Sequence, residues 1–312
     1  MKNNIEMKNN YRFIMKILIV LVFVVGCFIS QNTNVEAKVK KNVHDVKALK
    51  QIIKQQRNRG ARVPRNINAR KYKWDKKTGR LVKINWRSLK VAGKVDFNRL
   101  KGLKELECSS NQITELNVNR LKSLKYLYCK KNKIERLRIT RLTKLKELEC
   151  GYNNIKKLNV DKNAKLNYLK FQNNQIKKIN LKKLKKLQFL WCSNNKLETL
   201  NLSKCERIYQ GINCSNNQLK KLKLRKNSFI GYLDCSNNQL ETLNLDYIYE
   251  IQHIYCRNNK LKKLDFAHTD TSLLFQIEVD LDVEMIGLNE KKYNKKQRPF
   301  ENPTYWIFEK DY

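Results

Sequence analysis

Histidine is scarce in this 312-residue sequence, and this scarcity bears on metal chemistry. Only His44, His253 and His268 occur, and they form no four-ligand set with the cysteines at the spacing of a metal site. The sequence also lacks a nucleophile elbow, a phosphate-binding loop and a metalloprotease helix. We therefore expect no metal, no cofactor and no catalytic residues.

Acidic residues are also few. The chain has 28 Asp and Glu against 67 Lys and Arg, which gives a formal net charge of +39 and a pI near 9.9. An excess of this size makes an anionic surface or polymer a candidate partner, although a solvated lysine face needs no partner at all. Nucleic acid is disfavoured, because no aromatic platform for stacking bases accompanies the basic residues.

No apolar run reaches the roughly 20 residues of a membrane span. The longest, Ile17–Ser30, follows several lysines and precedes a small-residue pattern that ends at Ala37. This predicts an export signal cleaved after Ala37. Two alternatives stay open, namely lipidation of Cys27 and an uncleaved amino-terminal anchor. All three imply a secreted or cell-surface protein.

A short internal repeat dominates the sequence from residue 103 onwards. Its first copy sets the slots Leu103, Leu106, Cys108, Asn111, Ile113, Leu116 and Val118. The cysteine slot recurs with a period of 21, with one step of 22, as Cys108, Cys129, Cys150, Phe171, Cys192, Cys214, Cys235 and Cys256. The slot three positions later is always asparagine: Asn111, Asn132, Asn153, Asn174, Asn195, Asn217, Asn238 and Asn259.

The residue types in these slots predict the structure of one unit. Apolar and polar residues alternate around Leu106, as in a short strand with one buried face. The asparagine amide can both donate to and accept from backbone groups that are buried where the chain turns. Because one unit cannot bury its own apolar slots, units must stack. We expect a parallel sheet of eight or nine strands, with 3₁₀ or extended segments on the other side.

The pattern L-x-x-L-x-C-x-x-N-x-[IL] resembles the leucine-rich repeats of bacterial surface proteins, specifically internalin-like proteins with a cysteine in the strand. The resemblance covers residues 81–266. It implies a horseshoe-shaped solenoid with its parallel sheet on the concave face, and a role in adhesion or recognition. Members of the group are often fixed to the wall by a carboxy-terminal sorting signal. No L-P-x-T-G motif follows the repeats, so we do not expect sortase anchoring.

Four regions follow from the position of the repeats. They are a signal peptide (1–37), an amino-terminal cap of helix and hairpin (38–80), the repeats (81–266; one degenerate cap unit and eight full units) and a carboxy-terminal cap (267–312).

The amino-terminal cap is predicted to begin with a helix. Residues Asp45–Arg59 have a helical apolar face, with Asp45 as the amino cap and Gly60 as the stop. Residues Tyr72–Trp86 predict a hairpin that turns around 75–79. The degenerate unit follows, with Leu89 in its asparagine slot.

The carboxy-terminal cap is predicted to contain a strand over Leu273–Val283. Its outward residues would be Glu278, Asp280 and Asp282. We expect the aromatic tail around Tyr305, Trp306 and Phe308 to fold back over the last turn.

The cysteines have a structural explanation. Seven of the nine occupy an inward slot that Phe171 fills once, which predicts buried, reduced thiols. Equivalent positions on neighbouring parallel strands lie about 4.8 Å apart, wider than the roughly 3.8 Å between Cβ atoms of a disulfide. Cys205, near the one-residue insertion, is the candidate for an exposed free thiol.

The outward strand positions are the candidate binding site. They are aromatic and acidic, and exposed aromatic side chains are common anchors of interfaces. We predict a protein partner for this face and a monomeric protein; glycan binding is an alternative, and simple stacking of strand-favouring aromatics is another. The predicted site residues are Glu105, Glu107, Tyr126, Tyr128, Glu147, Glu149, Tyr168, Phe189, Trp191, Tyr232, Asp234, His253 and Tyr255.

The lysines lie in other positions of the repeat. Pairs such as Lys156 with Lys157 follow the asparagine slot, and the run 182–186 is almost all lysine. Segment 38–80 adds 16 basic residues against Asp45 and Asp75. We expect these surfaces to hold the protein against anionic wall polymers or lipid head groups, in a salt-sensitive way.

Overall fold

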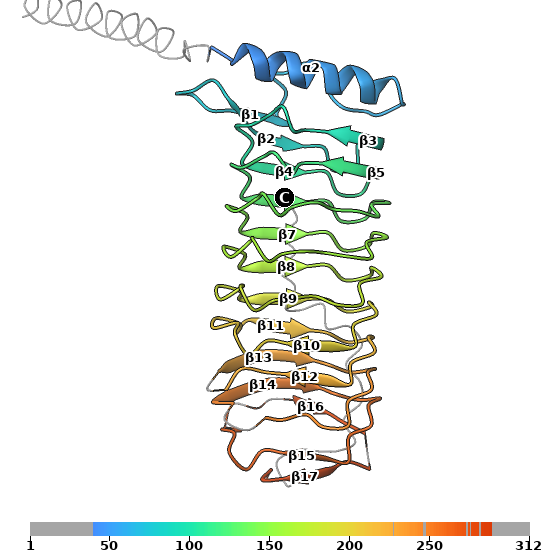
Figure 1. Cartoon of the computed structure of the whole chain (residues 1–312), viewed down its shortest axis with the longest axis vertical. Helices are drawn as coiled ribbons and strands as arrows, with labels where there is room; N and C mark the ends of the chain where they lie inside the picture. Colours follow the sequence, from blue (N-terminus) through green and yellow to red (C-terminus); the bar gives the residue numbers. More distant parts are fainter. Residues whose placement is uncertain are drawn as a thin grey trace, which may run out of the picture. The chain divides into compact units, whose positions relative to one another are not determined.

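A computed structural model of the chain describes residues 40–288 except 227, 246, 247, 273, 275 and 281. The predicted export signal, Cys27 and the aromatic tail lie outside the described residues. From Lys41 onwards the chain forms one unit, in which successive coils stack on one another (Figure 1).

The principal sheet takes one strand from each coil. Ten of its strands run parallel to their neighbours, and β1 joins β2 as an antiparallel hairpin. The register follows the repeat, since Leu106 pairs with Leu127 and Leu127 with Leu148. In order, the strands are β1 (Tyr72–Trp74), β2 (Leu81–Asn85), β4 (Glu105–Glu107), β6 (Tyr126–Tyr128), β7 (Glu147–Glu149), β8 (Tyr168–Lys170), β9 (Phe189–Trp191), β11 (Gly211–Asn213), β13 (Phe229–Asp234), β14 (Glu250–Tyr255) and β16 (Gln276–Glu278).

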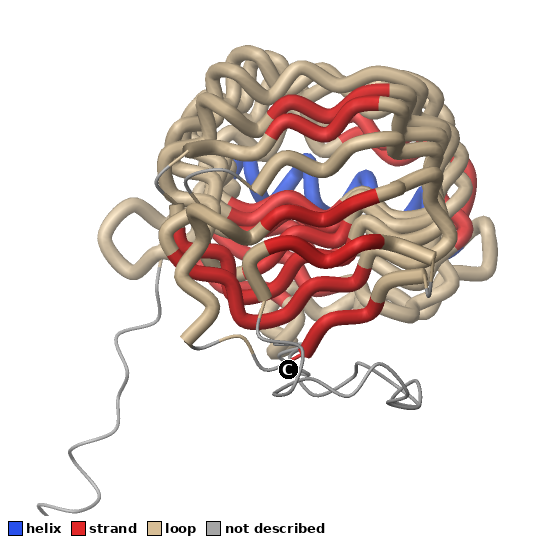
Figure 2. The backbone as a smooth tube through the Cα atoms, turned by 90° about the horizontal axis from the view of Figure 1, so that it is seen from below, coloured by secondary structure: helices blue, strands red, loops and turns tan. Residues whose placement is uncertain are grey.

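The other side of the coils is extended, as predicted, because so short a repeat leaves no room there for a helix. Short strands pair there at three places: β3 (Ala92–Asp96) with β5 (Gln112–Asn117), β10 (Thr199–Asn201) with β12 (Lys221–Lys223), and β15 (Lys263–Asp265) with β17 (Glu284–Ile286). Figure 2 looks along the stack and shows strands on two opposite sides of the coils, joined by turns.

The core lies between these two sides. Leu106, Leu127 and their equivalents are fully buried, and so are the cysteines of the marker slot. All eight cysteines in the described part of the chain are free thiols and buried. The prediction of a buried, reduced cysteine ladder is confirmed.

Cys205 is not exposed, and that prediction is wrong. Its side chain is fully buried, with Sγ 3.8 Å from the carbonyl oxygen of Leu181. Cys205 lies one repeat after Leu184, in a further inward slot that Leu121 and Leu142 also occupy. It therefore replaces a core leucine.

The asparagine slot works as predicted. In Asn153, Nδ2 donates to the carbonyl oxygens of Cys129, Cys150 and Gly151 at 3.0–3.1 Å, and Oδ1 accepts from the amide of Ile134 at 3.0 Å. Cys129 and Ile134 belong to the preceding unit, so each side chain joins two coils. The residue just before the slot has a left-handed backbone, with φ between 53° and 55° from Ser110 to Asn258.

The amino-terminal cap contains α2 (Val43–Arg57). Its amino cap is Asn42, whose side chain accepts from the amide of Asp45 at 3.1 Å, so the prediction of Asp45 as the cap is wrong. Asp45 is instead buried, where it accepts from the amide of Leu81 at 2.9 Å and forms an ion pair with Arg80 at 2.9 Å. It thereby fixes the helix to the first strand of the repeats.

The carboxy-terminal strand is shorter than predicted. Among the described residues of the predicted span, only Gln276–Glu278 form a strand, and Asp280 does not point outward. Its carboxylate accepts from the backbone amides of Asn258 and Asn259 at 3.0 and 3.3 Å. Elsewhere the next coil's carbonyl oxygens take this role, as that of Lys130 does for Ser110. Asp280 thus substitutes for a backbone acceptor.

Candidate functional site on the sheet face

The strand residues on either side of each buried leucine or isoleucine form one surface, here named the sheet face. All thirteen predicted site residues lie on it and are partly exposed. Trp191 and Tyr128 are therefore not enclosed in the core. The structure also adds β2 and β16 to the two ends of this face, with Lys83 and Gln276 in register.

An aromatic cluster occupies the middle of the sheet face. The rings of Tyr168 and Phe189 stack with centroids 6.0 Å apart, and Trp191 meets Phe189 edge to face at 5.5 Å. Lys170 Nζ lies 5.4 Å from the Phe189 ring centroid and 5.3 Å from that of Trp191. These contacts span β8 and β9 and hold each ring in place while part of it faces solvent.

Gly211 leaves room for this cluster. It pairs with Phe189 across β9 and β11, and a Cβ atom added to it would lie 3.3 Å from Phe189 Cε2. The phenyl ring therefore leans into space that a side chain at 211 would fill. The sequence shows this glycine at a strand position that carries a side chain in the other full units.

The acidic residues towards the amino-terminal end of the face have partners within the protein. The Tyr128 hydroxyl donates to Glu147 Oε2 at 2.6 Å, and burial raises the pKa of Tyr128. Glu149 pairs with Lys170 at 3.2 Å and with Lys130 at 3.8 Å.

Two further carboxylates at this end are also paired. Glu105 pairs with Lys83 at 2.7 Å. Glu107 accepts from the amide of Ser109 at 2.6 Å, and burial raises its pKa. The negative charge of this end of the face is therefore partly neutralised.

A polar and aromatic group occupies the other end of the face. The rings of Tyr232 and Tyr255 lie 5.4 Å apart, and burial raises the pKa of Tyr255 to about 12. Asp234 accepts from Asn213 Nδ2 at 3.1 Å and from Ser236 Oγ at 2.6 Å, while burial raises its pKa. Burial lowers the pKa of His253. This end presents tyrosine rings beside a hydrogen-bonded carboxylate.

The described residues contain no group of three or more His, Cys, Asp or Glu side chains that could bind a metal ion. No described helix is long and apolar enough to cross a membrane.

The chain has the fold of leucine-rich-repeat proteins, with a helical cap. The functional domain of InlJ from Listeria monocytogenes, which includes a cysteine ladder, superposes with a TM-score of 0.52 at 22% identity, covering 68% of this chain and 56% of that one. The leucine-rich repeat domain of APL1 gives 0.52 at 19% identity, covering 67% and 58%. The LRIM1/APL1C complex contains a chain that gives 0.52 at 19%, covering 64% and 40%.

These likenesses show the fold and no more. The matched part spans less than two thirds of the length of each of these three structures. No protein-family profile matches the sequence, and no curated protein is similar to it.

Proposed function

We propose that this chain is an exported, internalin-like recognition protein whose sheet face binds a protein partner. The proposal extends to its basic surfaces, which would associate with an anionic cell envelope. The observation that carries it is the aromatic cluster, in which Tyr168, Phe189 and Trp191 are packed against one another yet remain partly exposed.

Aromatic side chains that are already ordered suit an interface. They lose little conformational freedom on binding and bury a large apolar area, which is why such residues are frequent hot spots. The cysteine ladder supports the internalin-like assignment, since the InlJ domain also has one. The LRIM1/APL1C structure is a complex of two proteins, which supports a protein partner for this fold.

Affinity capture with mutant chains tests the sheet face. Purified chain from residue 38 onwards would be compared with the double variant Trp191→Ala, Tyr128→Ala for capture of surface proteins. We expect the double variant to bind the captured partner at least about tenfold more weakly. Tyr152→Ala is the matched control, because Tyr152 is an exposed aromatic residue on a turn, outside the sheet face.

If the double variant and the wild type bound the captured partner with equal affinity, the sheet face would not be the binding surface. Circular dichroism of both variants checks that neither change unfolds the repeats.

Glycan binding is the second candidate, and the same cluster favours it. Sugar rings stack on exposed aromatic faces, and Trp191 offers one beside Lys170. A glycan array separates the two candidates. Binding of a defined glycan that Trp191→Ala abolishes would replace the protein partner with a sugar.

Export and envelope association have their own test. The cellular location of the full chain would be followed by fractionation, with and without residues 1–37. We expect secretion or surface attachment that depends on this segment, and release from cells when the salt concentration is raised. Retention in the cytoplasm would contradict export, and retention at high salt would contradict electrostatic association.

A further inference from the structure

The turns that precede the strands of the principal sheet contain charged residues that are almost all basic. These turns, here named the basic turns, carry seventeen lysines and arginines, and their acidic residues are Asp161 and Glu206. Glu206 is already paired with Lys185 at 2.9 Å. The basic turns are residues 98–104, 119–125, 140–146, 161–167, 182–188 and 203–207.

Within the basic turns, one position is a cation in six consecutive units. The six residues recur once per repeat, all are exposed, and together they form the basic column: Arg99, Arg120, Arg141, Lys162, Lys183 and Lys204. Since adjacent coils are about 4.8 Å apart, the basic column is a row of charges about 25 Å long, parallel to the axis of the stack.

Side chains of preceding coils keep the basic column in register. Asn98 Oδ1 accepts from the backbone amide of Arg120 at 2.8 Å, and Asn119 Oδ1 accepts from that of Arg141 at 3.2 Å. These bonds fix the backbone of the turns and leave the guanidinium groups of Arg120 and Arg141 out of the bonding. The row is therefore ordered at the backbone and free to adapt at these charged ends, whereas Arg99 Nη1 donates to Gln51 Oε1 at 3.2 Å.

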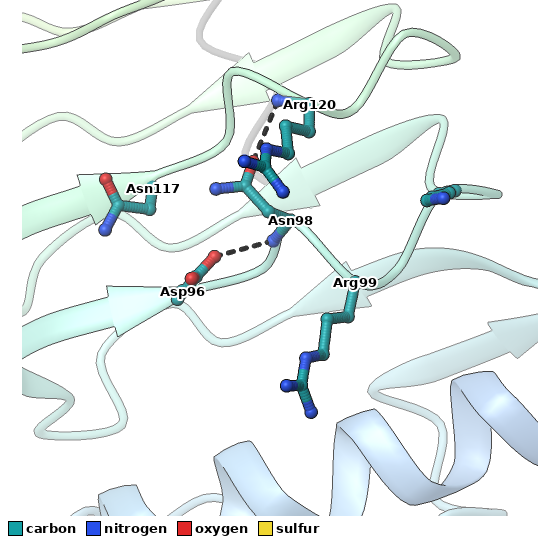
Figure 3. A pocket seen from close by; sticks show the side chains of 6 residues that line it. Asp96, Asn98, Arg99, Asn117 and Arg120 are labelled. Carbon is teal, nitrogen blue, oxygen red and sulfur yellow. Dashed lines mark hydrogen bonds between the residues drawn. The ribbon is translucent and has the colours of Figure 1, made fainter.

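A cavity of about 610 Å³ opens at the amino-terminal end of the basic column. Figure 3 shows Arg99 and Arg120 beside it, from two successive turns, together with Asn98 and Asn117. Asp96 also lines it, and its carboxylate accepts from the backbone amide of Asn98 at 2.8 Å. Because Arg99 Nη1 already donates to Gln51 Oε1, an anionic group in the cavity would chiefly meet Arg120 and Lys101.

We propose that the basic column binds a linear, phosphate-bearing polymer of the cell envelope. The polymer chain would run parallel to the stack and meet one cation in each coil, from the cavity beside Arg120 onwards. Guanidinium groups suit this ligand because their paired N–H donors match two oxygens of one phosphate. This inference rests on the proposed envelope association and is independent of the sheet face.

The surface fits a polymer better than a lipid bilayer. The exposed large apolar side chains in the described part of the chain are Val43, Tyr152, Tyr209 and Tyr249, and only Tyr209, two residues after the last basic turn, lies near this surface. A surface that inserts into a bilayer uses such side chains to reach the acyl region. The basic turns also lack the exposed aromatic rings on which nucleic-acid bases stack.

Two matched triple variants test the basic column. The column variant is Lys162→Gln, Lys183→Gln, Lys204→Gln. The control is Lys156→Gln, Lys177→Gln, Lys220→Gln, which removes the same charge from exposed lysines three positions after the asparagine slot. Affinity for long-chain inorganic polyphosphate would be measured by titration at fixed salt. We expect the column variant to bind about tenfold more weakly, and the control less than about threefold.

Several outcomes would overturn the proposal. Equal loss in the two triple variants would show that only net charge matters. If tripolyphosphate bound with the same affinity as long-chain polyphosphate, the polymer would not contact the cations of several coils at once. Column-dependent binding to phosphatidylglycerol vesicles, without binding to polyphosphate, would assign the surface to a membrane instead.

The sheet face supplies an internal control. Trp191→Ala should leave the affinity for polyphosphate unchanged, because Trp191 lies on a strand outside the basic turns. Failure of the sheet-face proposal and failure of the basic-column proposal are thus read from different variants and different ligands.

Discussion

The hydroxyl of Tyr128 donates a hydrogen bond of 2.6 Å to Glu147 Oε2, and this bond joins two adjacent coils across the sheet face. Tyr128 lies in β6 and Glu147 in β7. The face is thus an internally bonded surface before any partner arrives.

Removing this hydroxyl should have a small but measurable effect. Tyr128→Phe is expected to lower the free energy of unfolding by about 1 kcal/mol, the usual contribution of a partly exposed hydrogen bond. Because burial raises the pKa of Tyr128, its ionisation should also disappear from the highest-pH part of the ultraviolet titration. Glu147→Gln is the companion variant, because it removes the carboxylate that accepts from the Tyr128 hydroxyl. An ultraviolet titration that is unchanged in both variants would contradict the raised pKa of Tyr128.

The asparagine slot should tolerate substitution poorly. Asn153→Ala leaves three carbonyl groups and the amide of Ile134 without their side-chain partner in the core. We expect a loss of about 3 kcal/mol in urea unfolding. Asn154 is exposed, so Asn154→Ala is the matched control and should change stability by less than about 0.5 kcal/mol. Similar losses in the two variants would show that the slot has no special role.

Cys205 should be chemically inert in the folded protein. Burial raises its pKa from 9.0 to about 12, so almost no thiolate exists at pH 8. Its alkylation by iodoacetamide, followed by mass spectrometry, is expected only after denaturant is added. Alkylation of Cys205 in the native protein would show that its thiol is exposed, as the sequence suggested, and would contradict its burial.

The same pKa predicts a loss of stability at alkaline pH. The unfolded thiol of Cys205 ionises near pH 9, whereas the folded one keeps its proton until about pH 12. Its contribution to stability is therefore complete below pH 9 and declines between pH 9 and 12, by about 1.4 kcal/mol per pH unit. The stability difference between wild type and Cys205→Ala should narrow over this range. A stability difference that stayed constant between pH 9 and 12 would contradict the raised pKa of Cys205.

Asp45 should anchor the helical cap. It is fully buried, and Asp45→Ala removes the partner of Arg80 and of the Leu81 amide at once. We expect a loss of about 3 kcal/mol together with faster amide hydrogen exchange in α2. Asp96→Ala, at an exposed position, is the control. Unaltered exchange in α2 would show that other contacts hold the helix.

The sequence predicted the parts of the fold that repeat. The marker and asparagine slots each recur eight times, so the buried thiols and the turn bonding followed from spacing and residue type. Cys205 was mispredicted because the nearby insertion indicated an exposed turn, whereas the residue falls in a second inward slot that Leu121, Leu142 and Leu184 also occupy. This second slot follows the same 21-residue repeat, so the sequence contained the information needed to place Cys205 in the core.

The features that occur once were harder to predict. Asn42 and Asp45 are both good helix caps by residue type, and the buried partner Arg80, which decides the role of Asp45, lies far along the chain beyond the hairpin. For Asp280, alternation predicted an outward side chain, but its carboxylate accepts from the amides of Asn258 and Asn259, which in other units bond to carbonyl oxygens of the next coil. On the sheet face, the spacing predicted which strand positions point outward. Pairings such as Tyr128 with Glu147 depend on side-chain rotamers, which spacing does not encode.

The asparagine bonds have a direction. Each side chain bonds within its own turn and also to the turn of the unit before it, so Asn132 donates to the carbonyl oxygens of Cys129 and Cys108 and accepts from the amide of Ile113. Removing the carboxy-terminal unit would therefore leave an amide of the preceding unit without its acceptor, as the loss of Asn259 would for Leu240. The array thus has a polarity along its axis.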